Sequence, residues 1–261
     1  MTGAAPADDL TACAQLVERA DPDRFLATMA APVPARQMLF PLCALNVEVA
    51  RAPWLTQEPL IAQMRLQWWR DALAEIAAGT PVRRHHVTTP LAAILPSNLA
   101  ADLDQLVRAR YWDINKQPFD DLTGLDRHID QTAGTLTSVA ARALGPADDA
   151  VARDYGWATG LANWLCATPE LIARGRVPLP DPSPQGIRLL ATEGLRRLTR
   201  ARANRRAISA TARPALLTGW QAATLLKIAE AEPDRVLRAT LTQGATRKRL
   251  SLIRQSTTGR W

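Results

Sequence analysis

The chain has 261 residues, with 32 Lys and Arg against 25 Asp and Glu, so its formal net charge is +7. This length is enough for one large domain or two small ones, and 47% hydrophobic residues excludes intrinsic disorder for most of the chain. The basic excess favours an anionic partner, and nucleic acid, a membrane surface and a phosphorylated ligand all satisfy it.

The sequence contains no signal for export, membrane spanning or metal capture by cysteine. Cys13, Cys43 and Cys166 are scattered, without the short spacing of a zinc site or a disulfide framework. No uncharged stretch approaches the roughly 20 apolar residues of a spanning helix. The first twenty residues are acidic before any strong apolar run, the opposite of a signal peptide. We therefore expect a cytoplasmic protein that is at most peripheral on the inner membrane face.

Helical periodicity dominates the chain, and alternating β-branched runs are missing. Over 59–78, Leu60, Met64 and Trp68 lie near one helix face, with Pro59 suited to the first turn and Gly79 to the end. The same reasoning predicts helices over 8–20, 34–52, 97–111, 119–144, 147–168, 193–212, 214–231 and 246–256. The predicted fold class is all-α.

The stretch 175–186 contains four prolines and predicts an extended crossover. It suits either a linker between two domains or a loop inside one, and we favour a loop within a single domain over 1–261. Charge is divided near this point: residues 1–187 hold 16 basic and 21 acidic side chains (−5), whereas 188–261 hold 16 and 4 (+12).

The basic part has three interpretations. Its arginines could pair with carboxylates in the acidic part, or they could contact anionic lipid head groups or a membrane-bound partner. Nucleic-acid binding is the weakest interpretation, because the basic side chains lack interleaved aromatic residues.

Three segments could carry binding or chemistry. They are Leu45–Arg51, Met64–Leu73 and Leu165–Pro180. In the second segment, the adjacent Trp68 and Trp69 suggest that one ring lies in the core and the other at its boundary. The candidate ligand- or partner-binding residues in them are Asn46, Glu48, Arg51, Arg65, Gln67, Arg70, Glu170, Arg174 and Arg176.

Together with Thr132-Ala133-Gly134-Thr135, these segments resemble the squalene/phytoene synthase family in their order and separation. The similarity runs from about Asp21 to Ala231 and leaves a basic C-terminal tail over 232–261. The resemblance implies an isoprenoid-synthase-like helical bundle around a central cavity. It also implies head-to-head condensation of two isoprenyl diphosphates, with Mg²⁺ held by two facing Asp-x-x-x-Asp motifs.

The sequence departs from that family at both motifs. Ala50 and Trp54 stand where the first pair of aspartates is expected, and Ala167 and Leu171 where the second is expected, beside Glu170. We therefore predict no catalytic residue and no metal site, so Mg²⁺ would be a cofactor only if an altered prenyltransferase remained.

Other carboxylates at helical i, i+4 spacing could replace the missing ligands. The two such pairs, Asp126 with Asp130 and Asp71 with Glu75, are interpreted as solvated helix faces. His128, between the first two, and His85-His86 are likewise interpreted as surface residues.

The substitutions resemble one branch of the family, which includes an assembly factor of mitochondrial respiratory complex I. The segments "ALNVEVAR" and "CATPELIARGRVPLP" carry this similarity. It implies a non-catalytic role in assembling NADH dehydrogenase, with complex I subunits or assembly intermediates and an anionic membrane surface as partners, and an isoprenoid or lipid as a further candidate ligand. No nucleic-acid partner is expected. The alternative is a prenyltransferase acting on isoprenyl diphosphates with altered metal ligands.

Overall fold

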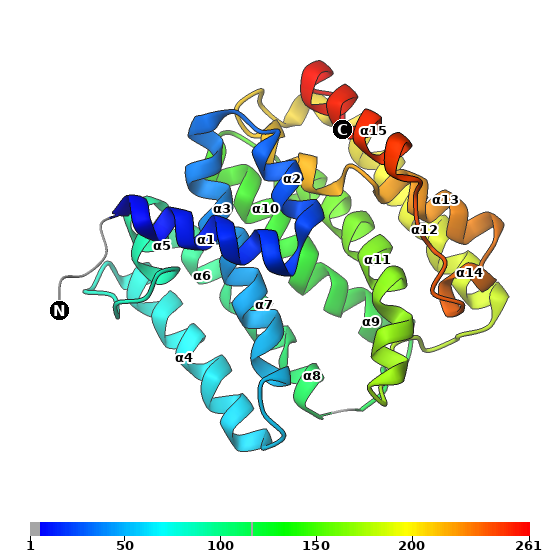
Figure 1. The fold of residues 1–261 in the computed structure, drawn as a ribbon, viewed down its shortest axis with the longest axis horizontal. Helices are drawn as coiled ribbons and strands as arrows, with labels where there is room; N and C mark the ends of the chain where they lie inside the picture. Colours follow the sequence, from blue (N-terminus) through cyan, green and yellow to red (C-terminus); the bar gives the residue numbers. More distant parts are fainter. Residues whose placement is uncertain (1–5, 116) are drawn as a thin grey trace.

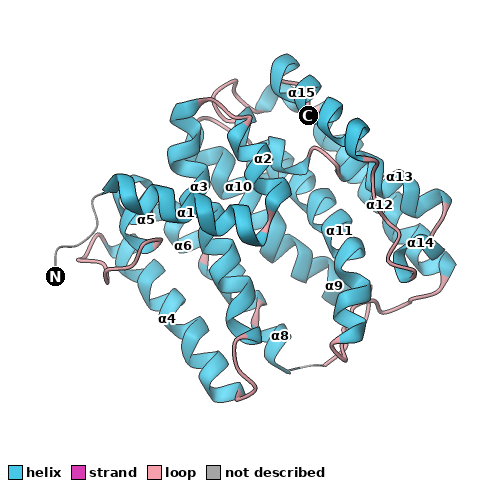
Figure 2. Cartoon of the chain, viewed as in Figure 1, coloured by secondary structure: helices cyan, strands magenta, loops and turns pink. Residues whose placement is uncertain are grey.

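The computed structural model describes residues 6–115 and 117–261, and within them every regular element is helical (Figure 2). The predicted all-α class is confirmed. The longer elements are α1 (Pro6–Ala20), α2 (Pro22–Met29), α3 (Val33–Arg51), α4 (Pro59–Ala78), α9 (Leu122–Ile129), α10 (Thr135–Leu144), α11 (Asp149–Ala173), α12 (Pro184–Ala203), α13 (Ala222–Ala231) and α15 (Ala245–Thr258). The shorter ones are α5 (Thr88–Ile94), α6 (Ser97–Asp102), α7 (Asp104–Ala109), α8 (Tyr111–Asn115), α14 (Asp234–Leu237), three 3₁₀ turns, η1 (Ala52–Trp54), η3 (Arg205–Ala207) and η4 (Arg213–Gly219), and a π-helical turn, η2 (Asp130–Gly134).

The helices with clear end signals lie where the sequence predicts them. α4 begins at Pro59 and ends at Ala78, before Gly79, whose φ of +66° is the left-handed conformation that glycine adopts easily. The prediction of a single helix over 97–111 is wrong, because this stretch forms three separate elements: α6, α7 and the start of α8. The predicted helix over 119–144 is present as the continuous run α9, η2 and α10.

The prediction that α11 ends before Pro169 is also wrong. The helix continues to Ala173, because the proline lacks only its own N–H and the donors after it still form hydrogen bonds. For example, Arg174 N donates to the Glu170 carbonyl oxygen at 3.0 Å. The extended crossover is confirmed between Ala173 and Pro184, although α12 begins earlier than predicted, at Pro184. It returns the chain so that α12 packs along α11.

α11 lies at the centre of the bundle and packs against α10, η2 and α12 (Figure 1). Two glycines bring it unusually close to η2. A Cβ on Gly156 would lie 2.7 Å from the Ala133 carbonyl oxygen, and one on Gly160 would lie 2.4 Å from the Ala133 Cβ. Because only glycine leaves this space, the backbones of α11 and η2 form two adjoining walls of the interior.

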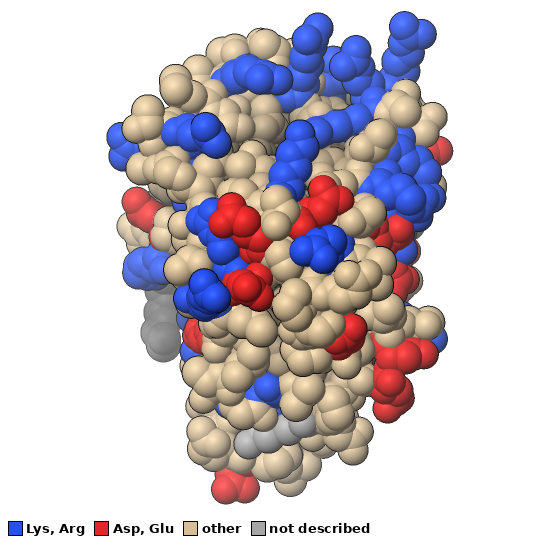
Figure 3. Space-filling view, turned by 90° about the vertical axis from the view of Figure 1, so that its right-hand side faces the viewer, with Lys and Arg blue, Asp and Glu red and all other residues tan. Residues whose placement is uncertain are grey.

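The acidic and basic parts of the sequence meet in space. Arg197 and Arg200 of α12 pair with Asp126 at 2.5 Å and with Asp154, so part of the basic excess is neutralised within the molecule. Lys and Arg gather over the upper part of the face that carries α12, α13 and α15 (Figure 3). We call this region the basic face. Six of its exposed arginines form no ion pair with any described residue: Arg205, Arg206, Arg247, Arg249, Arg254 and Arg260.

None of the helices described is both long and apolar enough to span a bilayer.

Candidate functional site

A cavity of about 300 Å³ lies between α3, η2 and α11. Its walls include all four positions at which the sequence resemblance leads one to expect aspartates: Ala50 and Trp54 at the end of α3 and in η1, and Ala167 and Leu171 on α11. We call it the central cavity. The predicted bundle around a central cavity is confirmed.

The lining of the central cavity is mixed. Its apolar residues include Ile129, Ala133, Leu136 and Gly160. Its polar and charged residues include Arg24, Asn46, Arg110, Asp113, His128, Asn163, Glu170 and Arg174. Such a space accepts a ligand with an apolar part and a charged or hydrogen-bonding part.

The carboxylates of this cavity do not form a magnesium site. Glu170 is exposed and pairs with Arg174 at 2.5 Å, and Asp113 lies 3.7 Å from Arg110. Among the residues described, no three His, Cys, Asp or Glu side chains come close enough to hold a metal ion. Mg²⁺ prefers several oxygen ligands in octahedral geometry, and the donors present do not fit it.

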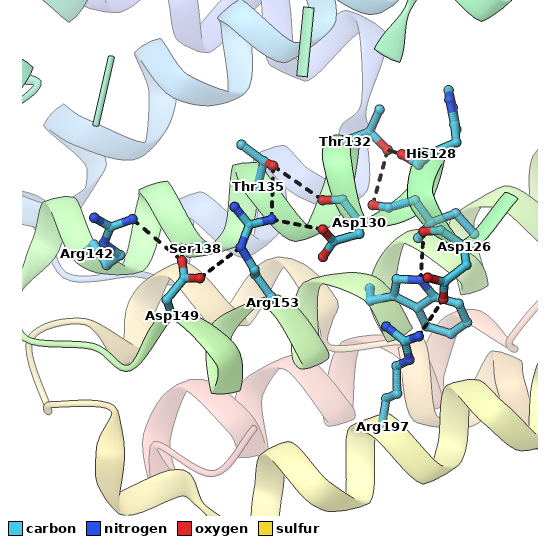
Figure 4. Close-up of polar contacts among 12 residues, drawn as sticks. Asp126, His128, Asp130, Thr132, Thr135, Ser138, Arg142, Asp149, Arg153 and Arg197 are labelled. Carbon is cyan, nitrogen blue, oxygen red and sulfur yellow. Dashed lines mark hydrogen bonds and ion pairs between the residues drawn. The ribbon is translucent and has the colours of Figure 1, made fainter. Parts of the chain in front are cut away.

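The carboxylates of the two alternative pairs form ion pairs with arginines. Asp126 faces Arg197, whereas Asp130 accepts from Arg153 at 3.1 Å, so the two carboxylates are held by different cations (Figure 4). On α4, Asp71 accepts from Gln67 at 2.7 Å, and Glu75 binds Arg83. Each of these carboxylates therefore has a structural partner.

A second cavity, of about 500 Å³, adjoins the central cavity and shares Trp54, Asp113 and Arg174 with it. Arg176 also lines it. Two guanidinium groups lie over the Trp54 ring, with the Arg174 Cζ 4.8 Å and the Arg176 Cζ 4.7 Å from its centroid. Cation–π attraction at these distances places two positive charges where the resemblance suggests a magnesium-binding carboxylate.

Arg176 is buried, with an exposed fraction of 5%, and it donates from Nη2 to the Asp113 backbone carbonyl oxygen. Its Nε and Nη1 have no hydrogen-bond partner. Burial lowers its pKa, and Asp113 opposes that effect. Burial also raises the pKa of the Asp113 carboxyl, against the lowering effect of Arg110 and Arg176. Burial thus disfavours the charge on both groups.

The sequence-based candidates are divided between the cavities and the surface. Asn46, Glu170 and Arg174 line the central cavity, and Arg176 the second. The remaining candidates lie elsewhere: Glu48 is buried and pairs with Arg51 at 2.5 Å, Arg65 is exposed, Gln67 donates to Asp71, and Arg70 binds Asp104 at 2.6 Å.

Sequence reasoning missed Arg24, Arg110 and Asp113 as cavity residues, and it misplaced His128. The interpretation of His128 as a surface residue is wrong: it is 5% exposed, and burial together with nearby Arg110 lowers its pKa to about 3. Asp126 and Asp130 on either side suggested a charged face, but the helix turns His128 inward between them. The apolar Leu125 and Ile129 were the signal that could have placed it.

The paired tryptophans are structural, as interpreted. Trp69 is 5% exposed and Trp68 is half-buried at the edge of the core. His85 and His86, interpreted as surface residues, are half-buried, and the His85 ring packs against both tryptophans with centroid separations of 5.4 and 5.2 Å.

The squalene/phytoene synthase family model matches residues 17–183, more than half of the chain. The chain belongs to the squalene/phytoene synthase family. Among curated proteins it is similar to the NADH dehydrogenase (ubiquinone) complex I assembly factor 6 of Homo sapiens, with 27% identity over 172 residues. The Drosophila melanogaster homologue is 29% identical over 175 residues. Each alignment covers 64% of this chain and 52% of the relative, so the chain spans about half the length of the curated relatives it matches.

Two solved members of the family share the fold. A dehydrosqualene synthase in complex with a ligand superposes with a TM-score of 0.75 at 16% identity and covers 97% of both chains. The squalene synthase HpnC from Alicyclobacillus acidocaldarius gives 0.69 at 15% identity, over 87% of this chain and 95% of the other. At these identities the similarity shows a shared arrangement of helices, and it agrees with the all-α bundle described above.

Proposed function

We propose that this protein is a non-catalytic member of the squalene/phytoene synthase family that acts in the assembly of respiratory complex I (NADH dehydrogenase). The observation that carries the proposal is the central cavity: Ala50, Trp54, Ala167 and Leu171 line it together, and its carboxylates face arginines. The similarity to complex I assembly factor 6 supports the assembly role.

The chemistry of prenyl transfer explains why the cavity matters. An allylic diphosphate ionises in an apolar space only if its developing negative charge is compensated, and Mg²⁺ provides that compensation in metal-ion catalysis. Two alanines, a leucine and a tryptophan cannot ligate Mg²⁺. The proposal therefore requires no metal cofactor.

The proposed place of action is a membrane surface, approached by the basic face. α15 supports this idea because its exposed Leu250 and Ile253 stand beside Arg249 and Arg254. Apolar side chains flanked by arginines are typical of helices that lie on anionic bilayers. The partners in this proposal are complex I subunits or assembly intermediates at that surface.

The decisive experiment is deletion of the gene in its own organism, followed by native gels stained for NADH:quinone oxidoreductase activity. We expect less fully assembled enzyme and accumulated subcomplexes, restored by the wild-type gene. Complementation with a Glu170→Ala gene is expected to succeed as well, because Glu170 holds only Arg174. Normal assembly in the deletion strain would refute the assembly role.

A second candidate function is prenyl transfer with altered ligands, which the arginines and the apolar residues that line the central cavity favour. Purified protein incubated with Mg²⁺ and farnesyl or geranylgeranyl diphosphate distinguishes the two. We expect no consumption of either substrate. Turnover that stops when the metal is chelated would support the second function and exclude the non-catalytic one.

A further inference from the structure

A further cavity lies on the basic face, where α12, α13 and α15 meet (Figure 1). Its volume is about 410 Å³, and it shares no lining residue with the central cavity or the second cavity. We call it the basic pocket, because every charged side chain that lines it is basic: Arg202, Arg205, Lys227, Arg254 and Arg260. The basic pocket is therefore a separate site on another part of the molecule.

Two tryptophans form the base of the basic pocket. Trp220 and Trp261 line it and are 3% and 7% exposed. The Trp261 ring packs edge-on against Tyr155 of α11, with centroids 4.9 Å apart, and the Trp261 backbone oxygen accepts from Arg202 Nε at 2.8 Å. Gln255 Nε2 of α15 donates to the Trp220 carbonyl oxygen at 2.9 Å. These contacts hold the pocket in shape without a ligand.

The cations of the basic pocket are not neutralised within the described part of the chain. No Asp or Glu lines the pocket. Four of its five cations form no ion pair with any described residue: Arg205, Lys227, Arg254 and Arg260. By contrast, Arg200 on α12, outside the pocket, pairs with Asp154. A concave surface lined by one sign of charge raises the local concentration of the opposite charge, so the pocket attracts an anion.

Exposed apolar side chains stand beside the basic pocket on α15. Leu250 and Ile253 are 61% and 58% exposed, whereas Leu252 between them is buried. Leu250 precedes Arg254 by four residues, so these two side chains share one helix face, and Arg254 lines the pocket. Apolar side chains next to a cationic pocket on a surface helix suit the boundary of a bilayer, where hydrocarbon and phosphate groups lie close together.

We propose that the basic pocket binds a membrane lipid whose head group is a phosphate monoester, as in phosphatidic acid. Such a group carries a charge of about −1.5 to −2 near pH 7 and three acceptor oxygens, so several unpaired cations can share it. Guanidinium groups match phosphate oxygens in geometry. This lipid site presupposes the membrane contact proposed above and identifies the head group that the basic face recognises.

Other anions fit the basic pocket less well. A carboxylate of a partner protein or a phosphodiester carries one charge, so it leaves more of the cations uncompensated. A phosphodiester head group such as that of phosphatidylglycerol also continues beyond the phosphate, whereas a monoester ends there and enters the pocket end-on. Single-stranded nucleic acid needs exposed rings on which its bases stack, and Trp220 and Trp261 are buried.

The test compares two kinds of vesicle that differ in head group at the same surface charge. Phosphatidylcholine vesicles contain either phosphatidic acid or phosphatidylglycerol, in amounts adjusted to equal zeta potential. The purified full chain is titrated against each kind and measured by co-sedimentation. We expect binding to be at least about tenfold tighter with phosphatidic acid, because the monoester accepts more charge-assisted hydrogen bonds.

Two double variants separate the basic pocket from the charge of the whole basic face. Arg205→Gln with Lys227→Gln removes two cations that line the pocket. Arg247→Gln with Arg249→Gln removes two that do not. All four side chains are exposed, so neither change opens the core. Both variants should bind phosphatidylglycerol vesicles more weakly by a similar factor, but only the pocket variant should lose the preference for phosphatidic acid, with the ratio of the two affinities falling to about one.

The outcomes distinguish the lipid site from the membrane contact. Equal binding of the wild-type protein to both kinds of vesicle would overturn the lipid site and leave the membrane contact intact, as would an equal loss of preference in the two double variants. Failure to bind either kind would reject the membrane contact as well, whereas the role in complex I assembly has its own test in the deletion strain. Glycerol phosphate in solution that binds as tightly as phosphatidic acid vesicles would overturn the assignment to a lipid.

Discussion

His128 makes the stability of the protein sensitive to acid. Burial and the neighbouring Arg110 lower its pKa to about 3, whereas in the unfolded chain the value is near 6.5. Below pH 6.5 the unfolded chain therefore takes up a proton that the folded protein does not, and acid favours unfolding. Between pH 6.5 and pH 5 this single group should cost about 2 kcal/mol of unfolding free energy.

Urea unfolding of wild type and His128→Gln at several pH values tests this expectation. The variant should lose less stability on acidification, with the difference developing below pH 6.5. His85, whose pKa is lowered to about 4 mainly by burial, retains its own acid sensitivity in both proteins. Identical pH dependence in wild type and variant would contradict the assignment of a buried, neutral His128.

At this scale the sequence predicts a cavity residue only where a motif marks it. Asn46, Glu170 and Arg174 were found because they belong to segments of recognisable pattern. Arg24 follows Asp23 and Arg110 follows Arg108 closely, so both stand in charged stretches that resemble solvated helix faces, and their direction depends on helices elsewhere in the chain. Arg110 also lies at the break between α7 and α8, which no proline or glycine marks in the sequence.

Among the elements, the contact of α11 with η2 is the most sensitive to added volume. Gly156→Ala would place a methyl group 2.7 Å from both the Ala133 carbonyl oxygen and the Thr137 side chain, so the backbone must shift. Overpacking of this kind costs about 1–3 kcal/mol, and the better helix propensity of alanine returns at most about 1 kcal/mol. We expect a net loss of stability in chemical denaturation.

Gly124→Ala in α9 is the matched control. The nearest atom to its added methyl group is 3.5 Å away, an ordinary contact, so the gain in helix propensity remains and the variant should be as stable as wild type or more so. Equal effects of the two substitutions would mean that α11 and η2 are less closely packed than described.

The elements that the sequence predicts well are those with local start and stop signals. α4, between Pro59 and Gly79, has both. α2 was missed although Asp21 caps it, accepting from Arg24 N at 3.0 Å, and Pro22 opens it; a length of eight residues is too short for a convincing periodic pattern. α6, α7 and α8 are divided by packing against α4 and η2, which no local signal encodes.

For the whole molecule, the uneven distribution of charge leads to a test of the proposed membrane contact. Replacing Arg247, Arg249 and Arg254 by glutamine removes three charges from the basic face. At roughly 1 kcal/mol per charge near an anionic surface, binding to phosphatidylglycerol vesicles should fall about a hundredfold, and wild-type binding should weaken as salt rises. Sedimentation with vesicles measures both effects.

The control replaces three exposed arginines on other helices: Arg19 of α1, Arg65 of α4 and Arg127 of α9. This triple variant has the same net charge and should keep most of the vesicle binding. If the two triple variants bind alike, net charge rather than the basic face determines binding, and the proposed orientation is wrong.

The ion pairs between α12 and the acidic part of the chain also bear on how the protein is made. Asp126 and Asp154 leave the ribosome well before Arg197 and Arg200, their partners in the finished bundle. Until α12 emerges, the face of α11 against which it packs has no cover. Folding during synthesis must therefore wait for the last third of the chain, and a nascent chain arrested before α12 is the form most exposed to aggregation.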